Sequence, residues 1–284
     1  MYPILSWSFV TAQSAMATTA IARTISTTMR IFNKRRMCAV PVLLLLLLLM
    51  SGCGSQETLT VVFPKVGSAD SAILMTKTAT VVIDTGEDGD GDKVLDVLSD
   101  HHRNTIDLLV ISHYDKDHVG GAAEILQQCT VKRVIGSTSP KISDETAAYY
   151  AMLEQTGLTE EVLDAPLSLE LGGMDLTVLP PQQAEYDSSQ SNNSSTVVRL
   201  QYGNTAFFFA GDAMTERVAE LVPELEAGAF DLIKIPHHGR DEDTTTSLLP
   251  CLKSGGAAVI TSSKKEPESQ EVLDVLQASG IATY

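Results

Sequence analysis

Residues 113–121 have the sequence HYDKDHVGG, and they follow directly after the apolar run 108–111. Within residues 113–118 stand two histidines and two aspartates, which can converge on one point at the end of an expected strand. Imidazole nitrogens and carboxylate oxygens together suit Zn²⁺ or Mn²⁺. The glycine pair lets the backbone turn sharply beside this cluster. We therefore expect a metal site at this strand end.

The chain around this motif alternates between short strands and helices, in two rough halves. The expected strands, many of them rich in β-branched residues, are 59–63, 72–75, 80–83, 108–111, 131–135, 167–171, 176–179, 196–202, 205–209, 232–235 and 257–260. The expected helices are 93–98, 122–128, 144–155, 214–221 and 269–279. A polar, Ser/Asn/Gln-rich loop spans 180–195. This order predicts one layered α/β domain with mixed sheets.

Other polar side chains follow expected strands or lie in polar loops. Outside the first motif, an expected strand is followed by each of Asp84, Asp212 and the pair His237 and His238. An aspartate at a strand end is common in turns, so Asp212 alone is a weak signal. The combination of these residues with the motif at 113–121 is specific.

The motif HxDxDH at 113–118 resembles the HxHxDH motif of the metallo-β-lactamase superfamily. Asp115 stands where that motif has its second histidine. With Ser112 before it and two glycines after it, the variant resembles the extracytoplasmic hydrolase domain of the ComEC family of competence proteins. The segments NNSS at 192–195 and FFFAGD at 207–212 carry the same resemblance. The likeness covers nearly all of the chain from residue 59 onward and implies an α/β fold, a four-layer αββα sandwich with mixed sheets.

The resemblance also implies one or two divalent metal ions, Zn or Mn. The implied metal ligands are His113, Asp115, Asp117, His118, Asp212, His237 and His238. The first two would hold one ion, and the next two would hold a second ion with one histidine of the final pair. Asp212 would bridge the two ions. The sequence leaves open which histidine of the pair is the ligand, and the other would support it.

Asp117 and Asp212 are the catalytic candidates that this resemblance gives. A divalent ion lowers the pKa of a bound water, which can then attack a phosphorus or carbonyl centre, and Asp117 would orient that water. The loop 180–195 would offer Asn193 and Ser194 to the substrate's oxyanion. Asp70 and Asp84 would support the site.

Two departures from the superfamily pattern stand out. The third-motif histidine has no counterpart, because NNS at 192–194 lies where it would be, and this weakens the expected first metal position. The superfamily also continues past the final helix with another strand, whereas this sequence ends at Tyr284.

The N-terminal segment has the pattern of a secretory signal. A basic cluster at 30–36 precedes the apolar run 38–50 and the tetrapeptide MSGC, which resembles a bacterial lipobox ending at Cys53. We expect an upstream extension without function at 1–28, a lipoprotein signal peptide at 29–52, the lipidated Cys53 with a tether at 53–57, and the hydrolase domain at 58–284. A plain N-terminal membrane anchor is the alternative, although the apolar run is short for a span.

Charge and cysteine content bear on the possible partners of the chain and on the state of its thiols. Residues 1–52 carry five basic side chains and no acidic one, so the formal charge of −16 becomes −21 without them. So acidic a surface argues against tight, non-specific DNA binding. Cys129 and Cys251 could pair outside the cytoplasm or remain free. We expect the chain on the outer face of the bacterial cytoplasmic membrane, held there by its lipid, and no stable protein partner is implied.

Three functions are compatible with these patterns. The first is a phosphodiesterase or nuclease, because several carboxylates suit phosphoryl chemistry and Mn²⁺ better than a histidine-rich site does. The second is an ester or amide hydrolase, including lactam-type substrates, against which the missing histidine and Asp115 argue. The third is a non-catalytic lipoprotein that kept the fold, which the retained motif residues disfavour.

Overall fold

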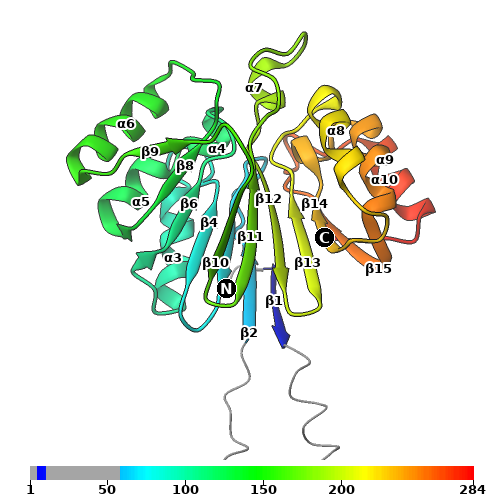
Figure 1. Ribbon diagram of the computed structural model, residues 1–284, viewed down its shortest axis with the longest axis horizontal. Helices are drawn as coiled ribbons and strands as arrows, with labels where there is room; N and C mark the ends of the chain where they lie inside the picture. The colour runs from blue at the N-terminus through cyan, green and yellow to red at the C-terminus, as the bar shows by residue number, and fades with distance from the viewer. Residues whose placement is uncertain (1–4, 11–57) are drawn as a thin grey trace, which may run out of the picture.

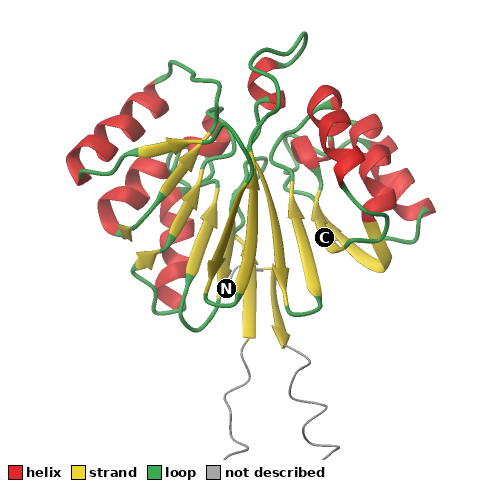
Figure 2. Ribbon diagram, in the orientation of Figure 1, coloured by secondary structure: helices red, strands yellow, loops and turns green. Residues whose placement is uncertain are grey.

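Two mixed β-sheets face each other at the centre of the structure, a computed structural model that describes residues 5–10 and 58–284 (Figure 1). Helices cover the outer face of each sheet, so the layers run helix, sheet, sheet, helix (Figure 2). The expected four-layer α/β sandwich with mixed sheets is confirmed.

The first sheet has the strand order β1-β2-β3-β4-β6-β8-β9. Its strands are β1 (Leu5–Val10), β2 (Thr58–Phe63), β3 (Ala72–Met75), β4 (Thr80–Ile83), β6 (Leu108–Val110), β8 (Val134–Gly136) and β9 (Glu160–Val162). Pairing is antiparallel from β1 to β4 and parallel from β4 to β9. The helices on this side are α3 (Gly91–Asp100), α5 (Ala122–Gln128) and α6 (Asp144–Thr156). A separate two-stranded sheet pairs β5 (Thr105–Ile106) with β7 (Thr130–Val131).

The second sheet has the strand order β10-β11-β12-β13-β14-β15-β16, antiparallel up to β13 and parallel afterwards. Its strands are β10 (Leu167–Leu171), β11 (Met174–Leu179), β12 (Val197–Tyr202), β13 (Thr205–Phe209), β14 (Phe230–Lys234), β15 (Leu252–Val259) and β16 (Ala282–Thr283). Its helices are α8 (Thr215–Leu221), α9 (Glu242–Leu248) and α10 (Gln270–Ala278). Short 3₁₀ turns lie at Val222–Glu224, Pro236–Gly239 and Leu249–Cys251.

Alternating side chains build three cores from these layers. In β4, Val81 and Ile83 pack between the two sheets, whereas Val82 packs under the helices of the first half. Phe207 and Phe208 of β13 divide in the same way between the central core and the helices of the second half. Because successive strand residues point to opposite faces, a strand buried on both faces is a continuous apolar run. This explains why the central strands are apolar throughout.

The parallel strands place four chain segments at one edge of the sandwich. Strands β4 and β6 are parallel neighbours, as are β13 and β14, and the carboxyl ends of parallel strands meet at one edge. Two short helices, α4 (Lys116–Val119) and α7 (Gln190–Asn193), lie at the same end of the molecule (Figure 1). The motif at 113–121 therefore lies beside the segments that follow β4, β13 and β14.

Several elements differ from the sequence-based expectation. The single strand expected at 131–135 is wrong, because β7 and β8 are separate strands in different sheets, with Lys132 and Arg133 between them. The expected loop 180–195 contains α7, and α9 follows the PHHG segment without an apolar pattern to predict it. A short strand, β16, follows the last helix.

The expected signal peptide and the lipidation site Cys53 lie outside the described residues. Strand β1 falls within the predicted extension 1–28 and pairs with β2, although its sequence carries no motif. In the part of the chain that the structure describes, no helix has both the length and the apolar character needed to cross a bilayer. Cys129 and Cys251 are both free thiols.

The buried side chain of Arg217 holds the loop 180–195 against α8. Its guanidinium donates to the backbone oxygens of Leu179 and Pro180 at 2.8 Å each and to that of Ser195 at 3.2 Å. It also pairs with Glu220 at 2.8 Å. Because Arg217 is fully buried, water could not take over its hydrogen bonds to these acceptors if the side chain were removed.

We predict that Arg217→Gln lowers the free energy of unfolding by about 3 kcal/mol or more, because it leaves buried acceptors and Glu220 unpaired. Arg240→Gln is the matched control, since Arg240 makes an exposed pair with Glu266 at 2.7 Å. Exposed pairs contribute about 1 kcal/mol or less. Urea unfolding of the two variants measures the difference, and equal losses would contradict the assigned role of Arg217.

Candidate metal centre

The end of β6 is joined to the end of β4 by the carboxylate of Asp84. Asp84 accepts hydrogen bonds from the backbone N–H and the hydroxyl of Ser112, both at 2.7 Å. Its own backbone N–H donates to Val110 at 2.8 Å, and its φ of 57° is in the left-handed region, which aspartate tolerates better than most residues. The carboxylate is buried, so it fixes the residues just before the HxDxDH motif.

The same carboxylate sets the direction of the His118 ring. Nδ1 of His118 lies 2.9 Å from Oδ2 of Asp84, which leaves Nε2 pointing to the other side. The carbonyl of His118 accepts hydrogen bonds at 2.8 Å from both the N–H and the hydroxyl of Thr85. Backbone and side chain of His118 are therefore both held from the end of β4.

The glycine pair after the motif is required by close backbone packing. A Cβ on Gly120 would lie 2.4 Å from the backbone nitrogen of Asp88. A Cβ on Gly121 would lie 2.4 Å from the carbonyl oxygen of Thr85. The turn from α4 to α5 thus touches the segment after β4 directly, and this contact positions α4.

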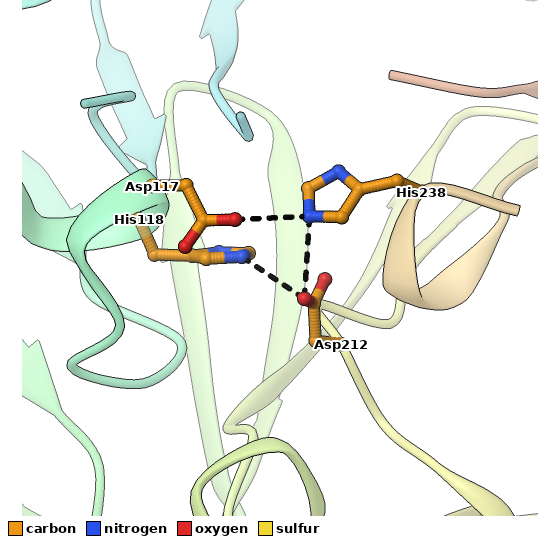
Figure 3. Close-up of side chains that lie close together, drawn as sticks. All are labelled: Asp117, His118, Asp212 and His238. Carbon is orange, nitrogen blue, oxygen red and sulfur yellow. Dashed lines mark ion pairs between the residues drawn. The ribbon is translucent and has the colours of Figure 1, made fainter. Parts of the chain in front are cut away.

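Asp212 enters the centre from the end of β13. Its backbone N–H donates to the hydroxyl of Ser195 at 3.1 Å, and Gly211 before it has a φ of 55°. Oδ2 of Asp212 lies 3.3 Å from Nε2 of His118 and 3.3 Å from Nε2 of His238. One carboxylate oxygen therefore faces two imidazoles (Figure 3).

His237 and His238 follow β14, and both have left-handed backbone conformations, with φ of 48° and 55°. His238 is fully buried, and its Nδ1 lies 3.0 Å from the carbonyl oxygen of Thr261. Its Nε2 then faces Oδ2 of Asp117 at 3.2 Å (Figure 3). The structure brings His238 into the cluster and leaves His237 beside it, with ring centroids 6.1 Å apart.

Four side chains form the candidate centre: Asp117, His118, Asp212 and His238. Each offers a ligand atom, and these atoms lie within 4.8 Å of one another. Four ligands held tetrahedrally at about 2.0–2.2 Å from one ion would lie about 3.3–3.6 Å apart. Three of the pairs, His118–Asp212, His238–Asp117 and His238–Asp212, have separations of 3.2–3.3 Å, close to this range.

Buried atoms without hydrogen-bond partners also fit a cation here. Nε2 of His118, Nε2 of His238 and Oδ1 of Asp212 are all buried without a hydrogen bond. Buried polar atoms are nearly always satisfied, so three such atoms in one cluster point to a missing partner. Imidazole and carboxylate groups are ligands for Zn²⁺ and Mn²⁺. The residues present therefore fit one divalent metal ion.

Burial and charge act against each other in this centre. Burial lowers the pKa of His238, but Asp212 and Asp70 raise it further, to about 9. Burial likewise lowers the pKa of His118, but the carboxylates of Asp212 and Asp84 raise it more and hold it well above the usual value. Burial raises the pKa of Asp212, but the two imidazoles hold it well below the usual range. Without a metal, the carboxylates thus draw protons onto the imidazoles.

Asp70 and Lys234 form a second layer behind the ligands. Lys234 and Thr261 both donate hydrogen bonds to the carboxylate of Asp70. Nζ of Lys234 also lies 3.7 Å from Oδ1 of Asp212. Sequence reasoning missed Lys234, although a lysine inside the apolar strand before PHHG was a usable signal. A second group of neighbouring ligand atoms comes from Asp70, Asp84 and His118. Its carboxylates already accept hydrogen bonds, that of Asp84 from Ser112 and that of Asp70 from Thr261 and Lys234.

His113 and Asp115 lie outside the four-residue cluster. The ring of His113 packs on that of His118 with centroids 4.0 Å apart, and its Nδ1 lies 3.1 Å from the hydroxyl of Ser112. Burial, with the neighbouring His118, lowers the pKa of His113 to about 4. Asp115 pairs with Lys141 at 2.7 Å. Nε2 of His113 is 3.9 Å from Oδ2 of Asp115, so the two side chains are neighbours.

Asn193 and Ser194, expected to contact substrate, are buried and engaged within the protein. The side-chain oxygen of Asn193 accepts from the backbone N–H groups of Met214 and Arg217 at 3.1 Å each, and so caps the start of α8. The hydroxyl of Ser194 donates to the carbonyl of Gln190 at 2.6 Å. The structure therefore gives both side chains a role in holding α7 in place.

The comparisons with known proteins all indicate the same protein family. The model of the Metallo-beta-lactamase superfamily matches residues 65–263. ComE operon protein 3 of Bacillus subtilis is 30% identical over 202 residues, which are 67% of this chain and 25% of that protein. Recombination protein 2 of Haemophilus influenzae is 24% identical over 206 residues, or 71% of this chain and 24% of that protein. The chain thus spans about a quarter of the length of each curated relative.

Solved structures support the fold. The metallo-beta-lactamase fold protein YhfI from Bacillus subtilis has a TM-score of 0.50 and 11% sequence identity, over 78% of this chain and 94% of that one. At this identity the likeness concerns the fold alone. The expected superfamily is confirmed, and both curated relatives are ComEC-like.

We predict that His238→Asn weakens metal binding by about 10- to 100-fold or more, because it removes a ligand nitrogen. His237→Asn is the matched control, since both positions have a positive φ that asparagine tolerates. Equilibrium dialysis against Mn²⁺ or Zn²⁺ measures both variants. A larger loss in His237→Asn would contradict the assignment of His238 as the ligand.

Proposed function

Because this chain belongs to the metallo-beta-lactamase superfamily and is a hydrolase of that superfamily, we propose that it cleaves phosphodiesters, as a phosphodiesterase or nuclease. The observation that carries the proposal is the carboxylate content of the centre. Asp117 and Asp212 supply two of the four ligands of the cluster. Asp115, which stands where the superfamily motif has its second histidine, adds a third carboxylate outside this cluster. Oxygen-rich donor sets favour hard ions such as Mn²⁺, which suit phosphoryl oxygens.

The relatives support the same class of substrate. One of the two curated relatives is named for recombination, a process that acts on DNA. Each relative is about four times as long as the region that matches this chain. A DNA substrate for this chain is therefore part of our proposal. The acidic chain, with a formal charge of −16, favours recognition of a phosphodiester at the centre over broad contact with a nucleic-acid backbone.

Among the four cluster residues, Asp117 is the one open to substrate. Its side chain is 21% exposed, whereas those of His118, His238 and Asp212 are at most 4% exposed. Burial raises the pKa of Asp117, but His238 and His118 hold it below the usual range, so the carboxylate is charged at neutral pH. An ionised carboxylate at the open side can accept a hydrogen bond from an attacking water and orient it.

The other residues bind or position. His118, His238 and Asp212 would hold a divalent ion with Asp117, and Asp84 and Thr261 fix the two imidazoles through their Nδ1 atoms. A bound divalent ion would acidify a water molecule and stabilise negative charge that develops on the substrate. Zn²⁺ and Mn²⁺ both suit this donor set.

We also propose that the chain is exported and anchored through a lipid on Cys53 to the outer face of the cytoplasmic membrane. The support is the sequence alone: a basic cluster, a short apolar run and the tetrapeptide MSGC. A lipid-anchored hydrolase at that surface would meet substrates from outside the cell.

The test uses the purified full chain loaded with Mn²⁺ or Zn²⁺, assayed on bis-p-nitrophenyl phosphate and on single-stranded DNA. We predict metal-dependent cleavage that falls about 100-fold or more in Asp117→Asn, because that variant loses a carboxylate that both holds the ion and orients the attacking water. Asp187→Asn, in the exposed part of the loop 180–195, is the control and keeps wild-type activity.

Two results would contradict the proposed function. If the metal-loaded protein cleaves neither phosphodiester but does cleave carboxylic esters or a β-lactam, it is an ester or amide hydrolase. Protein that binds no metal and cleaves none of these substrates would be a non-catalytic member of the superfamily.

A further inference from the structure

The carboxylate of Asp115 already has two partners that are not metals. Nζ of Lys141 lies 2.7 Å from its Oδ1, and the hydroxyl of Ser191 donates to the same oxygen. Lys141 comes from the segment between β8 and α6, and Ser191 comes from α7. Three separate segments of the chain therefore meet at Asp115, two residues before Asp117. The side chains of Asp115 and Lys141 are 27% and 44% exposed.

This arrangement leaves the first metal position of the superfamily without a complete ligand set. Among the described residues, the groups that could hold an ion include neither His113 nor Asp115. Their nearest ligand atoms, His113 Nε2 and Asp115 Oδ2, are 3.9 Å apart. Asp212 would have to serve both positions: its Oδ2 faces Nε2 of His118 and of His238, and only its Oδ1, which lies 3.7 Å from the ammonium nitrogen of Lys234, would be left for the first position.

Asn193 and Ser194, in the segment that replaces the superfamily's third histidine, do not supply a third ligand. Asn193 is buried and caps α8, and Ser194 donates its hydroxyl proton to Gln190. The carbonyl of Ser194 accepts from the hydroxyl of Ser137 at 2.7 Å. These groups hold α7 against the sandwich, so none of them points a free donor atom at the first position.

His113 alone does not complete the ligand set of the first metal position. The hydroxyl of Ser112 donates to Asp84, so it can only accept from Nδ1 of His113, and Nε2 then carries a lone pair. That nitrogen is buried without a hydrogen bond. One free nitrogen beside a carboxylate that a lysine already neutralises is a weak site for a divalent ion.

We propose that this chain holds a single metal ion, on Asp117, His118, Asp212 and His238, and that the Asp115–Lys141 pair takes the place of the second ion. The ammonium group of Lys141 then supplies the positive charge that faces an anionic substrate. The number of ions does not depend on the substrate. The role of Lys141 rests on the proposed phosphodiester function, because an ammonium group attracts a phosphodiester oxygen.

The number of ions is tested by stripping the purified full chain with a chelator, dialysing it against Mn²⁺ or Zn²⁺, and measuring metal and protein in the same sample. The expected result is one ion per chain in the wild type, in His113→Ala and in Lys141→Met. A count of two in the wild type that falls to one in His113→Ala would overturn the proposal. A count of zero would contradict both this proposal and the proposed function.

The role of Lys141 is tested by steady-state kinetics on bis-p-nitrophenyl phosphate. We predict that Lys141→Met raises KM about tenfold with little change in kcat, because the charge aids substrate binding rather than the chemical step. Lys141→Arg keeps the charge and most of the affinity. Lys132→Met is the matched control, since Lys132 also pairs with an aspartate, Asp107, at 2.7 Å and lies on a different surface segment. An unchanged KM in Lys141→Met, or the loss of its metal ion, would overturn the assigned role.

Discussion

The hydrogen bonds of one buried carboxylate, Asp84, fix the part of the centre that comes from the first sheet. Asp84 binds the backbone and hydroxyl of Ser112 at 2.7 Å, and it binds Nδ1 of His118 at 2.9 Å. The first two contacts join the ends of β4 and β6, and the third turns Nε2 of His118 toward Asp212. A metal-binding histidine usually donates its other ring nitrogen to such a partner, which fixes its orientation. His238 has the same arrangement through the carbonyl of Thr261.

Charge is the second constraint on this structure. Four carboxylates meet around the centre, namely those of Asp70, Asp84, Asp117 and Asp212, with Lys234 as the buried ammonium group among them. Burying so much negative charge is unfavourable unless cations compensate it. Lys234 compensates Asp70, and the imidazoles take up protons where no metal is bound. Metal binding must therefore displace protons, which links metal affinity to pH.

Much of the fold was predictable from local pattern, because continuous apolar runs of β-branched residues and glycine turns identify the central strands. The division of the segment 131–135 was not predictable, because Lys132 and Arg133 lie between two short strands that belong to different sheets. The choice between His237 and His238 depends on left-handed backbone angles and on Thr261, which is distant in sequence. The pairing of Asp115 with Lys141 and the capping role of Asn193 also depend on contacts between distant segments. No sequence pattern reports such contacts.

Asp117, His118, Asp212 and His238 together fit one metal ion. The most direct measurement is an anomalous difference map from crystals of the full chain grown with Zn²⁺ or Mn²⁺, recorded at the absorption edge of the metal. We predict a peak about 2.0–2.2 Å from one atom of each of these four side chains. A peak held instead by His113 and Asp115, with none between Asp212 and His238, would contradict it.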